Sequence, residues 1–421
     1  MYDWANSAFA TSVMAAVLPE FYSSFAGATL DKTIATSYWG YANTIAMLII
    51  AITAPLLGAM ADHSGAKKRY LGSFAGLGIV ATALLIGTGK GMWLYASLLY
   101  IFGRVGFGGA NIFYDSLLPH VADSGEIDRV SAEGYAYGYL GGGILLALNL
   151  LMILKPGLFG IPDAAWASRI SFLTVAVWWA AFSVPIFRNV SEPQALVSRD
   201  ESTRPLVAGY QRLRRTFRDI RRFRELITFL VAFWLYNDGV GTIIIMAVIF
   251  GAEIGIGTTH LIGAILMVQF LGIPFTLLFG RLPKRIGTRN SILCALGIYV
   301  IVTMLGYFMQ KPFHFWLLAF LVSMVQGGTQ ALSRSMYGSL LPPSKSAEFF
   351  GFYNVSSKVA GIIGPALFGV VGQVTGTSRL SIIAIVVFFI AGGLILAAVN
   401  QARGIEAATR EEREERLRAG V

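Results

Sequence analysis

The sequence predicts an all-α membrane protein with twelve transmembrane helices arranged as two pseudo-symmetric six-helix bundles. Three observations support this fold class: the composition, the spacing of the charged residues and an internal repeat. Of the 421 residues, 55% are hydrophobic and only 13% are charged. A soluble domain carries about 25% charged residues. The charges cluster between uncharged runs of about 20 residues, which is the length that spans a bilayer, so lipid is the expected solvent.

The individual spans follow from the apolar runs between charged breaks. We expect them at 4–24, 37–61, 69–88, 92–118, 132–154, 166–187, 225–250, 257–280, 289–309, 313–341, 347–375 and 378–402. We expect no cleavable signal peptide, because the first run begins at once and contains Asp3 and Asn6. No basic residue precedes that run, so an extension before Met1 is an open alternative.

The connections between spans differ in basic content in an alternating way. One set holds only Lys32, Lys90, Lys155, Lys311 and Arg379, whereas most other basic residues lie in the second set. The positive-inside rule therefore places the basic connections and both termini in the cytoplasm. We expect a multi-pass protein of the bacterial cytoplasmic membrane rather than of a vacuolar membrane.

The one long connection, 188–224, separates a bundle at 1–187 from a second bundle at 225–402. An apolar stripe at Leu206, Tyr210, Leu213, Phe217 and Ile220 alternates there with arginines. This pattern predicts an amphipathic helix at 206–222 that binds anionic lipids of the inner leaflet. Nucleic-acid binding is a weaker explanation of the arginines, because the apolar stripe and the membrane context favour lipid. The tail at 403–421 alternates in charge and is expected to be a solvated helix.

Three motifs recur at nearly one offset, which predicts a six-plus-six duplication. FYDSLLP at 113–119 recurs as MYGSLLP at 336–342. Spans one and seven open with the aromatic and polar clusters YDWANS from Tyr2 and WLYND from Trp234. Glycines and charges also recur in the loops after spans two and eight, at Gly58, Asp62, Gly65, Lys67, Lys68 and Arg69 and at Gly280, Lys284, Arg285, Gly287 and Arg289.

The loop pattern G-x3-D-x2-G-x-K-K-R from Gly58 resembles the loop signature of the major facilitator superfamily. Arg104-x3-Gly108 resembles the fourth-helix motif of that superfamily, with Phe107 in place of the usual glutamine. YDWANSAF at 2–9 and LYNDGVG at 235–241 look like the vacuole-effluxer group, which includes the yeast autophagy-related vacuolar amino-acid exporter. The resemblance covers essentially the whole chain. It implies the major facilitator fold and transport, with amino acids the best-supported substrate class. Lys284 departs from the pattern, because Asp62 holds the matching position in the first loop.

Polar residues share one face of several apolar spans, and such stripes must face protein or water rather than lipid. Arg334 and Lys358 are expected to hold a substrate carboxylate or to balance a buried acid. The candidate substrate-binding residues are Asn6, Asn111, Tyr236, Asn237, Gln326, Gln330, Arg334, Asn354 and Lys358. The candidate coupling residues are Asp3, Glu20, Arg104, Asp115 and Asp238.

The same ionisable residues also have structural explanations. Asp3, Asp115, Asp238 and Glu133 lie near the expected cytoplasmic ends of their spans, where partial hydration would lower the cost of their charge. Arg104 is open to a structural ion pair with Asp115 or another nearby acid.

The first loop motif is a candidate gate. Gly58 and Gly65 permit close helix approach and a tight turn. We expect Asp62 to pair with a cation or a helix N-terminus of the other half, and so to stabilise the outward-facing state.

The sequence argues against other classes of protein. Cys294 is the single cysteine, and the four histidines form no metal-ligand spacing, so we expect no metal, cofactor or enzymatic activity. One internally duplicated chain favours a monomeric carrier over an oligomeric channel. The sequence therefore favours a secondary transporter of a small polar solute, with amino acids preferred, that works by alternating access. Proton coupling and direction are left open, and export of an amphiphilic lipid-like or drug-like molecule is the alternative.

Overall fold

The computed structural model describes residues 1–123, 125–196, 204–218 and 220–420. The side chains of some helical residues, including that of Lys358, lie outside the described part. Nearly all of the described part is helical and it contains no strand. Nine helices in the described ranges are long and apolar enough to cross a membrane. The prediction of an all-α membrane protein is therefore confirmed.

The first bundle contains six long helical rods. Its first rod is continuous through α1 (Tyr2–Ala8), the π-helical η1 (Phe9–Ala16), α2 (Val17–Phe21) and η2 (Tyr22–Ala26). It continues with α3 (Lys32–Ser64), α4 (Lys67–Leu84) with η3 (Leu85–Gly87), α5 (Trp93–Ser116), α7 (Ile127–Leu154) and α8 (Ala164–Asn189). The short α6 (Leu118–Val121) and η4 (Pro156–Phe159) lie in connections.

The second bundle repeats this arrangement. Its rods are α10 (Arg224–Glu253), α11 (Thr258–Arg281), α13 (Thr288–Tyr307), α14 (Pro312–Ser339), α15 (Ser346–Thr375) and the pair α16 (Ser378–Ala384) and α17 (Val386–Ala398). The short α12 (Pro283–Ile286) and η6 (Pro343–Lys345) join them. Each of the twelve expected spans coincides with one rod to within a few residues.

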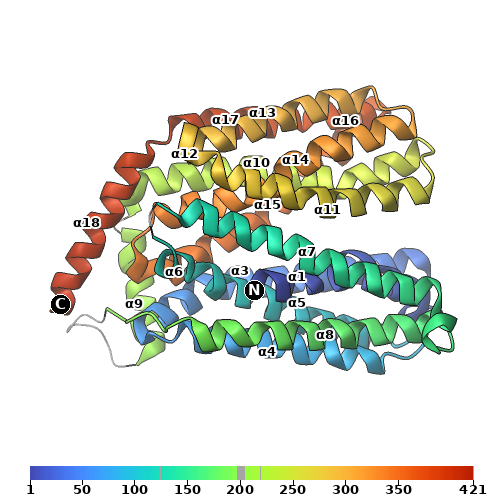
Figure 1. Cartoon of the computed structure of the whole chain (residues 1–421), viewed down its shortest axis with the longest axis horizontal. Coiled ribbons are helices and arrows are strands. Elements are labelled where there is room, and N and C mark those ends of the chain that lie inside the picture. The colour runs from blue at the N-terminus through green and yellow to red at the C-terminus, as the bar shows by residue number, and fades with distance from the viewer. Residues whose placement is uncertain (124, 197–203, 219, 421) are drawn as a thin grey trace.

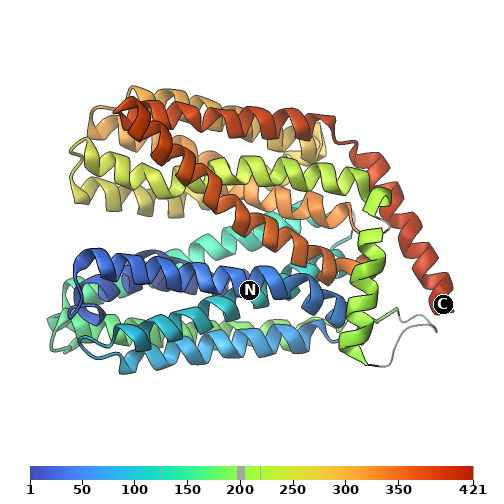
Figure 2. The same cartoon turned by 180° about the vertical axis from the view of Figure 1, so that it is seen from behind.

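The two bundles lie one above the other in Figures 1 and 2, and they meet through a few helices only. α3 contacts α15, and α7 contacts α11 and α14. The approach of α3 to α15 depends on Gly58, because a Cβ at that position would lie 2.2 Å from the carbonyl oxygen of Ala347. Small residues permit such close packing within a membrane.

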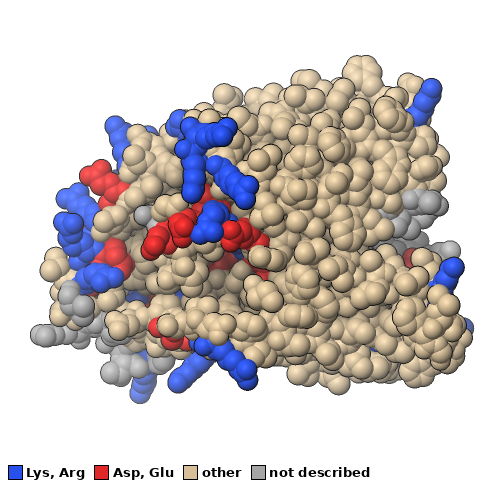
Figure 3. Space-filling model, in the orientation of Figure 1, with Lys and Arg blue, Asp and Glu red and all other residues tan. Residues whose placement is uncertain are grey.

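One end of the molecule carries most of the charge, and we call it the basic end. It holds α9 (Pro205–Arg218), η5 (Ile220–Phe223) and α18 (Gln401–Ala419), which cross the ends of the bundles in Figure 2. Figure 3 shows Lys, Arg, Asp and Glu gathered at this end, with only a few basic side chains at the opposite end. α9 packs on α3 through Gly209, whereas Leu206 and Tyr210 are exposed by 62% and 60%. The side chains of Phe217 and Ile220 lie outside the described part.

The tail helix α18 is not the fully solvated helix that its alternating charges predicted. One of its faces is buried and contains Glu411 and Glu415. Lys345 of η6 pairs with both, at 2.5 Å from Glu411 and 3.2 Å from Glu415. Burial alone would raise the pKa of Glu415, but Lys345 and Arg418 hold it below its usual value. The alternating pattern fits a helix with one docked acidic face equally well, and only the tertiary contact distinguishes the two.

Replacing Lys345 by glutamine is expected to release α18 from the bundle. The substitution leaves Glu411 and Glu415 buried without their lysine, a loss of roughly 2 kcal/mol after allowance for nearby solvent. Limited trypsin digestion should then cut faster at the arginines of α18, such as Arg410. The exposed Lys284 on α12 provides the matched control, and unchanged cleavage in Lys345→Gln would contradict the docking argument.

Candidate functional site

An arginine of the second bundle is buried among acids of the first. Arg334 of α14 is 4% exposed, and its guanidinium lies 3.3 Å from Asp3 and 3.2 Å from Asp115. Its Nε donates to the Ser131 hydroxyl at 2.9 Å, and its Nη2 donates to the Ser131 carbonyl at 3.0 Å. We call Asp3, Asp115, Ser131 and Arg334 the Arg334 cluster. It joins α1, α5 and α7 to α14, so it links the two bundles.

Aromatic rings and a glycine complete the surroundings of the cluster. The Tyr114 hydroxyl donates to Asp3 at 2.7 Å, and the guanidinium lies 4.5 Å from the ring centre of Tyr135. Gly134 leaves room for the ion pair, because a Cβ there would lie 2.3 Å from the Asp3 carboxylate. Within the cluster, two carboxylates share one guanidinium. Burial makes the charge of a carboxylate costly, and uptake of a proton would remove it.

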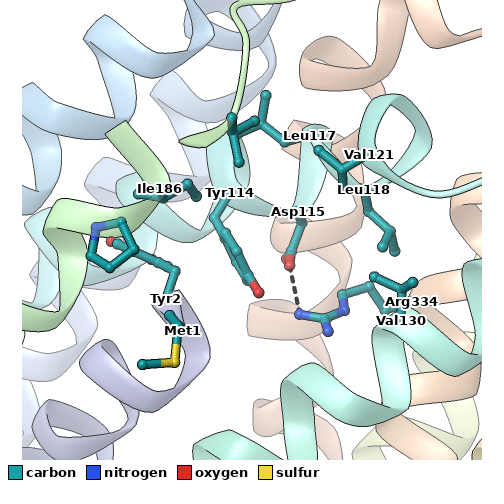
Figure 4. Close-up of a pocket in the computed structure, with 12 residues that line it drawn as sticks. Met1, Tyr2, Tyr114, Asp115, Leu117, Leu118, Val121, Val130, Ile186 and Arg334 are labelled. Carbon is teal, nitrogen blue, oxygen red and sulfur yellow. Dashed lines mark hydrogen bonds and ion pairs between the residues drawn. The ribbon is translucent and has the colours of Figure 1, made fainter. Parts of the chain in front are cut away.

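A cavity of about 270 Å³ adjoins this cluster on the first-bundle side. Figure 4 shows Asp115 and Arg334 pointing toward each other at its wall, with the Tyr114 hydroxyl beside them. Most of the other lining side chains, such as Val130 and Ile186, are apolar. A largely apolar cavity with a few convergent polar groups is typical of small-molecule sites.

The first loop motif forms a second contact between the bundles. The Asp62 carboxylate accepts the backbone N–H groups of Ala347 at 3.2 Å and Glu348 at 2.8 Å, in the first turn of α15. Unpaired N–H groups and the helix dipole make this turn a favourable site for an anion. Lys67 lies 3.0 Å from Asp62 and donates to the Ser346 hydroxyl at 2.6 Å. We call Asp62, Lys67, Ser346 and the first turn of α15 the seal, since together they hold the basic ends of the bundles against each other.

The other basic residues of the two loop motifs do not take part in the seal. Lys68 donates to the carbonyls of Phe187 and Val190, which lie within the first bundle. Arg289 donates to Val399 at 3.0 Å, which lies within the second bundle. Gly65 adopts a left-handed φ of 60° that ends α3. Arg69, Lys284 and Arg285 are exposed. Among the described residues Lys284 makes no contact that matches that of Asp62, and the second loop meets the first bundle through Thr288, whose hydroxyl donates to Asp128 at 2.7 Å.

His120 of α6 adds a titratable group to the seal. Its Nε2 lies 2.9 Å from the Lys67 ammonium and 3.3 Å from the Ser346 hydroxyl, and Asp62 lies on the far side of Lys67. The outer part of the ring is exposed, but desolvation on its inner side and the charge of Lys67 lower the pKa of His120. Neutral His120 accepts a hydrogen bond from Lys67, whereas protonated His120 would repel it.

Acidification at the basic end is therefore expected to weaken the seal. Neutral His120 stabilises the seal fully above the ordinary histidine pKa of about 6.5. This stabilisation is lost progressively as the pH falls below that value. Solvent at the exposed edge of the ring screens the repulsion, so we expect a gradual response. Spin-label distances across the basic end should lengthen from about pH 7.5 to about pH 5.5. His120→Gln should remove this response and His260→Gln should keep it; an unchanged response in His120→Gln would contradict the assignment.

The remaining candidate residues belong neither to the Arg334 cluster nor to the seal. Asn6 donates to Asn111 at 2.6 Å, and the Tyr236 hydroxyl lies 2.6 Å from that of Ser333. Asn354 donates to the Phe350 carbonyl at 3.2 Å. Asn237, Gln326 and Gln330 are partly buried, Glu20 is exposed away from the Arg334 cluster, and the side chain of Lys358 lies outside the described residues.

Two expectations about charged residues are wrong. Arg104 does not pair with Asp115, because Asp115 pairs with Arg334 of the other bundle. Asp3 and Asp238 are not partly hydrated: their exposures are 9% and 1%. Asp238 accepts the Gly364 N–H at 2.9 Å with one oxygen, and its other oxygen is buried with no hydrogen-bond partner among the described side chains. Packing between neighbouring helices removes the water that position along the span alone seemed to allow.

Sequence reasoning also missed several residues of these sites. Ser131 and Tyr135 lie one turn apart on α7, a spacing that could have indicated a polar face. Nothing in the local sequence signals that Gly134, His120 or Ser346 contacts a charged partner, because those partners come from distant helices.

Two six-helix bundles joined by charged contacts define a membrane transporter of the major facilitator class. A solved structure titled as the proton:xylose symporter XylE has the same fold, with a TM-score of 0.73, 15% identity and coverage of 97% of each chain. The chain itself belongs to the family described as "Vacuole effluxer Atg22 like", whose model matches residues 28–409.

Two curated relatives agree with this assignment. An uncharacterized MFS-type transporter, YxiO of Bacillus subtilis, is 37% identical over 403 residues, covering 95% of this chain and 94% of that protein. Autophagy-related protein 22 of Chaetomium globosum is 23% identical over 430 residues, covering 82% of this chain and 65% of that longer protein. These proteins are transporters rather than enzymes by their descriptions or family, so the predicted class of protein is confirmed.

Proposed function

We propose that this transporter exports amino acids from the cytoplasm by rocking its bundles, 1–187 and 225–402, about a site between them. The observation that carries the proposal is the Arg334 cluster, in which buried charges of both bundles are shared. Rocking must separate these charges, so it requires another ion to replace the lost partner. That requirement links movement of the bundles to binding of a proton or a charged solute.

The buried acids of the cluster support proton coupling. Asp3 and Asp115 share the Arg334 guanidinium, and burial favours the protonated form of a carboxyl group. A proton taken up by either acid would free Arg334 from part of its attraction and lower the cost of separating the bundles. Asp238 offers a second buried acid for the same role.

The direction of opening follows from the charge distribution. If the basic end faces the cytoplasm of a bacterial cell, as the positive-inside rule requires, the seal closes the cytoplasmic side. The state described above is then outward-facing. The effluxer description of the family supports export, and the amino-acid class follows from the family resemblance. Export of an amphiphilic molecule is the alternative, supported by the mainly apolar lining of the cavity.

Counterflow in proteoliposomes tests the function directly. Purified protein would be assayed with each of the common amino acids, with and without a proton gradient. Saturable flux that responds to the gradient supports proton-coupled amino-acid transport. Flux of a labelled amphiphile, with no flux of any amino acid from folded protein, would favour the alternative.

We further propose that α9 binds anionic lipid. Its Arg214 and Arg218 are exposed, as are the apolar side chains of Leu206 and Tyr210. An exposed apolar and basic helix at a bilayer surface is attracted by both properties. Replacing Leu206 and Tyr210 by serine should at least halve the stabilising effect of phosphatidylglycerol on the melting temperature. An equal effect in wild type and variant would contradict the proposal.

A further inference from the structure

A second intramembrane arginine has no acidic partner. Arg104 of α5 is 7% exposed, and it forms no ion pair with any residue that the structure describes. Its Nε is buried without a hydrogen-bond partner, and its Nη1 lies 2.7 Å from the thioether sulfur of Met14. A thioether is a weak acceptor and carries no charge. Arg104 is therefore a buried cation whose charge no acid among the described residues balances.

The position of Arg104 suits a transport site. It lies halfway along α5, about 17 Å from either end of the helix at about 1.5 Å per residue. The helix α5 contacts α15 of the second bundle, and its Val105 belongs to an apolar cluster with residues of both bundles. Met14, which Arg104 contacts, lies in the π-helical segment η1. Such π-helical segments are frequently found at functional sites.

The two intramembrane arginines thus differ in their need for an anion. Arg334 already faces two carboxylates, so an incoming anion would be repelled by Asp3 and Asp115. Arg104 faces none in the part of the chain that the structure describes, and leaving a charge buried and unpaired is costly in a membrane. An anion that enters between the bundles would offset this free-energy cost and accept charge-assisted hydrogen bonds from the guanidinium.

We propose that Arg104 binds the carboxylate group of the transported solute. The proposal deepens the proposed function and rests on it for the identity of the solute as an amino acid. It moves the carboxylate subsite from the second bundle to the first, and it leaves Arg334 to hold the bundles together.

Pairs of ligands that differ only in the carboxylate test this assignment. Leucine, serine and arginine would be compared with isoamylamine, ethanolamine and agmatine, their decarboxylated forms, by titration of the purified full chain. We expect at least one amino acid to bind at least tenfold more tightly than its amine. Arg104→Gln should remove this preference, and Arg104→Lys should keep part of it because it keeps the charge.

The matched control is Arg169→Gln. Arg169 is also an intramembrane arginine with a buried, unpartnered Nε, but it stacks on Phe25 and Trp166. This variant should keep the preference for the carboxylate. Equal binding of amines and amino acids by wild type, or an unchanged preference in folded Arg104→Gln, would overturn the proposal.

Transport and binding separate the two proposals. Amino-acid flux that is independent of Arg104 would leave the proposed function standing and overturn the carboxylate site. Arg104-dependent binding of carboxylates without amino-acid flux would support the site and remove the proposed function.

Discussion

Replacing Arg334 by glutamine is expected to abolish transport and to lower the free energy of unfolding by roughly 3–5 kcal/mol, the cost of leaving buried charges without their partner. Asp3 and Asp115 would then lose the cation that they share, and the hydrogen bonds to Ser131 would be lost. Arg334→Lys should retain part of the stability, because a lysine keeps the charge but cannot reproduce the forked geometry. Melting temperature and counterflow measure the two effects.

A separate variant tests geometry without removing charge. Gly134→Ala would place a methyl group against the Asp3 carboxylate and the Arg334 guanidinium, so it should impair transport while all charges remain. Arg285→Gln, on the exposed α12, is the control for loss of an arginine. Wild-type flux and melting temperature in Arg334→Gln would show that the cluster is dispensable.

Replacing Asp62 by asparagine is expected to open the basic end. The amide still accepts one hydrogen bond from α15, but the charge that pairs with buried Lys67 and with the helix N-terminus is lost. A loss of about 2–3 kcal/mol would shift the ratio of open to sealed molecules by roughly 30- to 150-fold. Distances between spin labels on the exposed Asn189 and Asn290, in a Cys294→Ser background, report the opening.

Two further variants serve as comparisons for Asp62→Asn. Asp163→Asn changes an acid that caps α8 at the opposite end of the molecule, so it should leave the distance distribution as in wild type. Gly58→Val should open the basic end by a different cause, since its side chain would meet the backbone of Ala347. An Asp62→Asn distribution identical to that of wild type would contradict the role of the seal.

The first loop motif shows which contacts the sequence pattern predicts and which it does not. The spacing of Gly58, Asp62 and Gly65 predicted a contact between the halves, because those residue types permit close approach and anion binding. It did not reveal His120 or Ser346, which come to Lys67 from α6 and α15. The same limit applies to α18, whose alternating charges are compatible with either solvation or docking.

The sequence alone determined the membrane class, the twelve spans, the repeat and the family, because each depends on local hydropathy or on motifs contiguous in the chain. Only the tertiary structure decided which charges meet. Arg334, Asp3 and Asp115 lie on three different helices, and nothing in the spacing along one helix specifies a partner on another. Packing also decided that Arg104 forms no ion pair with a described residue. The energetic role of a buried charge depends on its neighbours in space, and a one-dimensional pattern does not contain them.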